Sequence, residues 1–163
     1  MPDSVMRHQS APLRLVSLRL DVPELTRVAL QPGVVEAFRL TVQHHDGRTP
    51  DHVATAWRVR GQEYANLQIA YRRPTEKTLT IDLKLDLAKW NAFMAGLRLH
   101  AFDTLDDLPN IPWLGADLWL LERAAGSFHH DVIIAPMFAS GVHLALVGLI
   151  QEHLPQLLRE IQA

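Results

Sequence analysis

Residues 109–138 read PNIPWLGADLWLLERAAGSFHHDVIIAPMF, and this stretch does most to set the expected fold. Pro112 suits the first turn of a helix, because a proline there loses no hydrogen bond, and Gly126 suits the left-handed residue that ends a helix. We therefore expect a helix over residues 112–125, with a short apolar segment after it. Ser140 is a plausible N-cap for a second helix.

The first half of the chain predicts strands. Apolar and polar residues alternate in several segments, which is typical of an antiparallel sheet that buries one face. Asp46-Gly47 favours a tight hairpin turn. The expected strands cover residues 13–22, 34–45, 53–59, 67–71 and 78–85.

Helices are expected to cover the apolar face of this sheet. Residues 87–101 carry apolar side chains at helical spacing, and the helix that begins at Ser140 runs toward the C-terminus with Pro155 as a kink. Apolar residues surround most of this last helix, so part of its cover is expected from another copy of the chain. The sequence predicts a single α+β domain over residues 1–163, an antiparallel β-sheet meander of four to five strands packed by C-terminal α-helices, in a homo-oligomer (dimer or tetramer).

Composition excludes several classes of protein. Hydrophobic residues make up 48% of the 163 residues and the net charge is −2, with basic residues scattered, so nucleic-acid binding is not expected. There is no cysteine, hence no disulfide and no thiolate ligand for zinc. The first twelve residues do not resemble a secretory signal, which makes the cytoplasm the expected location. Residues 132–150 are nearly apolar, but Pro136 and His143 interrupt them, so no membrane span is expected.

The stretch 109–138 resembles the SecB family of export chaperones. The resemblance is carried by Pro109-Asn110-Ile111, Gly126-Ser127-Phe128, Ala135-Pro136 and Phe138, at nearly the family's spacing. It implies an antiparallel sheet backed by two C-terminal helices, assembly into dimers and tetramers, and an ATP-independent holdase that binds unfolded client polypeptides without a cofactor. The weak net charge and Pro112-Trp113-Leu114-Gly115, where the family has an aromatic-proline-tyrosine segment, favour a paralogue with a dedicated client over general export.

Aromatic residues are the candidates for client binding. Large aromatics usually pack in cores, but an exposed tryptophan beside an apolar sheet would suit an extended peptide. The expected client-binding residues are Trp57, Trp90, Trp113, Trp119 and Phe138.

Two His-His-Asp triplets raise the question of a metal site. In extended chain, His44 with Asp46, or His129 with Asp131, would offer two ligands to one ion. No third ligand stands at a diagnostic spacing, so we expect solvated turn residues and no metal. The known hydrolase and phosphate-binding motifs are missing, so an enzyme is not expected.

Two alternatives remain open. A helix-grip protein would wrap a curved sheet and its last helix around an apolar pocket for a small ligand, without catalysis. A histidine-dependent enzyme would require His129 and Asp131 to meet a further ligand inside a cleft.

Overall fold

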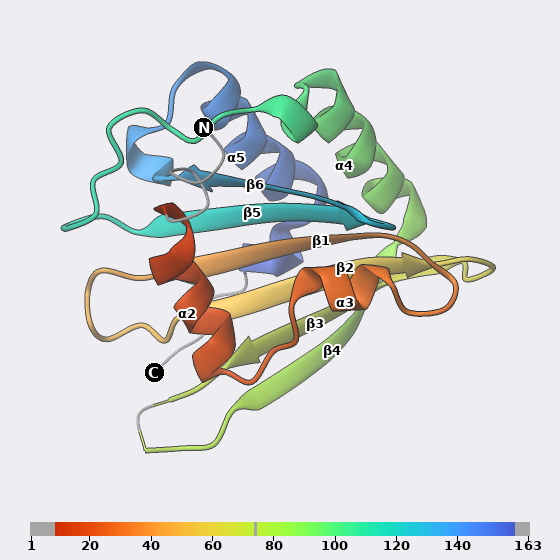
Figure 1. Cartoon of the computed structure of the whole chain (residues 1–163), viewed down its shortest axis with the longest axis horizontal. Helices are drawn as coiled ribbons and strands as arrows, with labels where there is room; N and C mark the ends of the chain where they lie inside the picture. The colour runs from red at the N-terminus through yellow and green to blue at the C-terminus, as the bar shows by residue number, and fades with distance from the viewer. Residues whose placement is uncertain (1–8, 74, 159–163) are drawn as a thin grey trace.

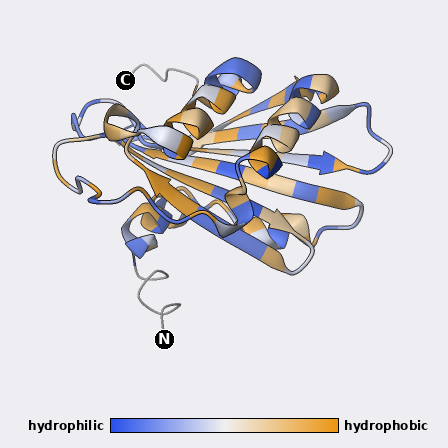
Figure 2. Ribbon diagram, turned by 90° about the horizontal axis from the view of Figure 1, so that it is seen from above, coloured by the Kyte–Doolittle hydropathy of each residue, from blue (hydrophilic) through white to orange (hydrophobic). Residues whose placement is uncertain are grey.

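The structure is a computed structural model that describes residues 9–73 and 75–158. A six-stranded antiparallel sheet lies between two helical layers (Figures 1 and 2). The strands are β1 (Val34–Gln43), β2 (His52–Val59), β3 (Tyr64–Tyr71), β4 (Leu79–Asp86), β5 (Leu118–Ala125) and β6 (Phe128–Ile134), in the order β4-β3-β2-β1-β5-β6. The expected α+β class with an antiparallel sheet packed by helices is confirmed, although the sheet has six strands rather than four to five.

Two long helices, α4 (Leu87–Leu99) and α5 (Gly141–His153), cover one face of the sheet. Asp86 caps α4 by accepting a hydrogen bond from the Lys89 amide at 3.1 Å. The core between helices and sheet contains the aromatic side chains Phe38, Trp90, Phe93 and Phe102. The two helices approach closely because α4 carries a glycine at the contact, and a Cβ on Gly96 would lie 2.6 Å from Leu149 Cδ2.

The apolar surface of α5 is largely covered within the chain. Leu146, Val147 and Ile150 are buried, whereas Leu144 is half exposed. The helix ends at His153, and the short 3-10 turn η3 (Pro155–Leu158) follows at the expected break. The sheet and α4 therefore supply most of the cover that the sequence assigned to another copy of the chain.

The second face of the sheet is covered by α2 (Ala11–Arg19) and α3 (Leu25–Ala29), which lie in front of the strands in Figure 1. The predicted strand over residues 13–22 is therefore wrong. The buried residues Leu13, Val16 and Leu20 are three and four positions apart, which is the period of a helix and not of a strand. The exposed Leu15 supplied the misleading alternation.

The predicted helix over residues 112–125 is also wrong, because residues 118–125 form β5. Helices cover both faces of this strand, so Leu118 and Leu120 on one face and Trp119 and Leu121 on the other are all buried. A strand buried on both faces is a continuous apolar run and lacks alternation. Gly126 does take a left-handed conformation, with φ of 56°, but it turns a β-hairpin instead of ending a helix.

Membrane insertion gains no support from the helices. Within the described residues, none of them is both long enough and apolar enough to cross a bilayer. The apolar segment 132–150 is divided between the end of β6, the 3-10 turn η2 (Pro136–Phe138) and most of α5.

Candidate functional sites

The five aromatic residues expected to bind a client do not form one surface. Trp90 is completely buried and Trp119 is nearly so, both in the core beneath α4 and α5. Trp57 is half-buried against the cluster that joins α3 to the sheet. Neither Trp90 nor Trp119 can contact a client in this conformation, and these two assignments are corrected: their indoles fill the domain core.

The remaining two residues lie near one end of the sheet. Trp113 is 41% exposed and Phe138 is 60% exposed, and their neighbours Leu114 and Met137 are 93% and 77% exposed. β5 begins where β6 ends, with Trp119 opposite Ile134, so the segment before β5 and the segment after β6 leave the sheet at the same end (Figure 1). We call Trp113, Leu114, Met137 and Phe138 the apolar rim. Large exposed apolar side chains at one end of the sheet make this end the candidate for an interaction site.

A second candidate site lies on the face covered by α2 and α3. The strand register aligns one polar row across the entire sheet, since directly paired residues point to the same face. The row consists of Asp82, Gln68, Thr55, Arg39, Glu122 and Asp131, in that order from β4 to β6. Its middle is covered by helices, so Arg39 and Glu122 are charged residues in a buried layer.

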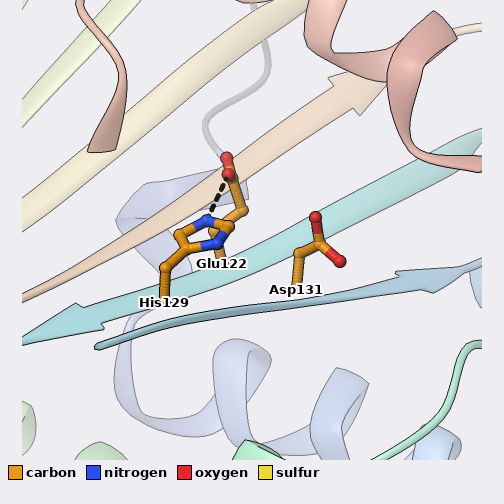
Figure 3. Close-up of side chains that lie close together, drawn as sticks. All are labelled: Glu122, His129 and Asp131. Carbon is orange, nitrogen blue, oxygen red and sulfur yellow. Dashed lines mark hydrogen bonds and ion pairs between the residues drawn. The ribbon is translucent and has the colours of Figure 1, made fainter. Parts of the chain in front are cut away.

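Three ligand-type side chains converge at the β6 end of this row. Glu122 comes from β5, and His129 and Asp131 come from β6, where alternate residues share a face (Figure 3). One ligand atom from each lies within 4.8 Å of the other two. The imidazole Nε2 of His129 donates a hydrogen bond to Glu122 Oε1 at 3.0 Å. We call these three residues the Glu-His-Asp cluster.

Arg14 of α2 caps the cluster. Its guanidinium forms an ion pair with Glu122 Oε1 at 3.1 Å and donates a hydrogen bond to Asp131 Oδ2. Arg39 lies beside Glu122 in the row. Its guanidinium donates hydrogen bonds to Thr55 Oγ1 at 3.0 Å and to the Pro23 carbonyl at 2.7 Å. Burial works to raise the pKa of Glu122, but the His129 hydrogen bond and the charges of Arg14 and Arg39 hold it below its usual value. Glu122 is therefore an ionised carboxylate that is almost fully buried.

A cavity of about 620 Å³ opens beside the cluster. His129, Asp131 and Arg14 line it, together with side chains from α2, from the start of α3 and from residues 105–107. Four carboxylates face it against a single guanidinium, the acids being Glu24, Asp106, Asp107 and Asp131. The lining therefore favours a cationic ligand over an anionic one.

His44, His45, His130 and His143 are occupied by structural contacts. His44 and His45 both bond to Asp117, so His44 does not join Asp46, whose carboxylate accepts from the Arg48 and Thr49 amides instead. His130 donates to the Leu105 carbonyl at 2.8 Å. His143 is buried, and it donates to the Asp106 carbonyl at 2.8 Å.

Glu122 is the functional candidate that sequence reasoning missed. The predicted helix over residues 112–125 gave no reason to place Glu122 beside His129 and Asp131. Had residues 118–125 been taken for a strand, a two-residue turn at Gly126-Ser127 would have placed Glu122 opposite Asp131, on the face that also carries His129. Comparison of the chain with protein-family models finds no match, and neither does comparison with curated proteins.

Proposed function

We propose that the protein is an ATP-independent holdase that binds apolar segments of a client polypeptide at the apolar rim. The exposure of Trp113, Leu114, Met137 and Phe138 is the observation that carries the proposal. A holdase binds the unfolded state by burying its apolar side chains and requires no cofactor or catalytic group. This is the function that the resemblance to the SecB family implies, with a dedicated client fitting the weak net charge better than general export.

The rim is suited to transient binding because it is small. Four exposed side chains offer far less apolar area than the interface of a permanent complex. Contact with several such surfaces at once would raise the overall affinity for a long unfolded chain. Assembly of several copies therefore belongs to the proposal.

The open edge of the sheet at β4 supports such an assembly. No described segment pairs with the outer side of this eight-residue strand, and an unpaired edge is a template for a further strand. If two copies paired antiparallel about a two-fold axis at Leu83, Asp82 of each copy would face Lys84 of the other, on the exposed face. Leu83 would then lie opposite its own symmetry mate.

The alternative of a helix-grip binder for a small apolar ligand gains no support. α5 packs beside α4 on one face of an open sheet, and the core between them is filled. The cavity described above lies on the opposite face and is lined mainly by polar and charged groups.

Aggregation of a denatured model protein, diluted from guanidinium without nucleotide, tests the holdase proposal. We expect the chain to reduce light scattering, and the double variant Trp113→Ser with Leu114→Ser to lose most of this effect while its stability changes by about 1 kcal/mol or less. Leu30→Ser is the matched control, because Leu30 is 67% exposed but precedes the start of β1, at the opposite end of the sheet from the rim. Equal suppression by the double variant and the control would contradict the proposal, as would no suppression by the unmodified chain.

Native mass measured by light scattering after size exclusion tests the assembly. We expect at least a dimer, which Lys84→Asp weakens and which the double change Asp82→Lys with Lys84→Asp restores, because only the double change brings opposite charges together again. A monomer at all concentrations would contradict the paired edge without affecting the rim.

A further inference from the structure

We infer that Glu122, His129 and Asp131 form a binding site for a divalent transition-metal ion, reached from the acidic cavity, and that Arg14 competes with the ion for the two carboxylates. The inference is independent of the holdase proposal, since the apolar rim plays no part in it.

The donor set is chemically suited to such an ion. One imidazole nitrogen and two carboxylate oxygens are the ligands that Zn²⁺ and its first-row neighbours take when no thiolate is present. Adjacent ligand atoms around an ion with bonds of about 2.1 Å lie about 3 to 3.4 Å apart. The 3.0 Å between His129 Nε2 and Glu122 Oε1 has this spacing. The ligand atoms of all three residues lie within 4.8 Å of one another, so small side-chain rotations would bring them to it.

The surroundings provide rigidity and access. Glu122 belongs to the interior strand β5 and has a side-chain exposure of only 3%, whereas His129 and Asp131 belong to β6, the outermost strand beside it. His129 and Asp131 are 23% and 24% exposed, and both face the cavity. Three protein ligands beside an open cavity leave coordination positions for water, an arrangement that catalytic and exchangeable metal sites share.

Arg14 now supplies the positive charge that the two carboxylates require. Burial of unpaired carboxylates is costly, so some cation must accompany Glu122 and Asp131. The Arg14 side chain is 40% exposed and is anchored otherwise by a bond from its Nε to Ser10 Oγ, so it can turn toward solvent when an ion enters. A metal ion would take the place of the Arg14 guanidinium, so the carboxylates of Glu122 and Asp131 would still be paired with a positive charge.

Titration of the full-length chain with Zn²⁺ by calorimetry, and with Co²⁺ by visible absorption, tests the site. We expect one ion per chain. The visible absorption bands of bound Co²⁺ should be those of an ion with nitrogen and oxygen ligands. Asp131→Asn and His129→Ala should each weaken binding about tenfold or more. Arg14→Gln should tighten it about tenfold, because the ion then no longer has to break the two ion pairs of Arg14.

His45→Ala is the matched control, because His45 is a surface histidine bonded to a carboxylate outside the cluster. It should bind Zn²⁺ as the unmodified chain does. Circular dichroism without metal identifies any variant that fails to fold, and Asp131→Asn, a change in a partly exposed residue that keeps the side chain's shape, preserves the test in that case. The inference is overturned if Asp131→Asn leaves the affinity unchanged, if His45→Ala abolishes binding, or if Arg14→Gln weakens it, the last result giving Arg14 a supporting role instead of a competing one.

Discussion

Acid should destabilise this protein through one buried histidine. His52 of β2 is almost fully buried, and its Nε2 donates to the Leu157 carbonyl in η3 at 2.9 Å. Burial lowers the pKa of His52 from 6.5 to about 4, and the nearby His44 adds to this effect. Above about pH 6.5 the imidazole is neutral in both the folded and the unfolded chain. Between pH 6.5 and 4 only the unfolded chain takes up the proton, so stability falls as the pH falls, and below about pH 4 the loss is complete.

The size of this loss follows from the two pKa values. A difference of about 2.5 pKa units, at about 1.4 kcal/mol each, corresponds to about 3 kcal/mol. The variant His52→Gln keeps an amide donor for the Leu157 carbonyl but cannot take up the proton. Urea unfolding between pH 7 and 4 should therefore show the unmodified chain losing about 3 kcal/mol more than the variant. Parallel stability curves for the two proteins would refute the reasoning, because all other titrating groups are common to both.

Two further changes test the helices. Gly148→Ala should stabilise the protein by about 0.5 to 1 kcal/mol, because no atom lies within 4 Å of the added Cβ and alanine is the better helix former. Gly96→Ala should stabilise it less or destabilise it, because the added Cβ would meet Leu149. Thermal unfolding compares the two variants, and an equal gain at both positions would contradict the close contact of α4 with α5. Asp86→Ala removes the cap of α4 and should cost about 1 kcal/mol in urea unfolding, and an unchanged midpoint would show that the Lys89 amide is satisfied by water instead.

The sequence was most informative where one face of an element is solvated. β3 and β4 were placed within a few residues because their outward positions are polar, as in Thr80, Asp82 and Lys84. The helix α4 was predicted for the same reason, since its apolar residues form one stripe. In each case, water on one side leaves a period in the sequence that identifies the element.

The failures come from segments whose second face is covered by distant parts of the chain. The sequence of β5 does not alternate between apolar and polar residues, because α2 packs on the face opposite α4 and α5. The residues around position 120 give no sign of this cover, since the helix begins far away in the chain, at Ala11. Pro112 and Gly126 then marked the two ends of an apparent helix, although the left-handed Gly126 turns the β5–β6 hairpin. The Glu-His-Asp cluster was missed with the strand, because its geometry exists only once β5 and β6 are paired.

The position of α2 has a consequence for any shortened form of the chain. The first described helix is the cover of Leu118, Leu120 and Ile133 and also the source of the guanidinium that neutralises Glu122. A fragment that starts at β1 would expose the apolar side chains of Leu118, Leu120 and Ile133 to water. It would also leave the buried carboxylate of Glu122 without the guanidinium of Arg14, and both changes destabilise the fold. The smallest piece that folds autonomously must therefore reach back to residue 10 or so, even though the sheet itself begins only at Val34.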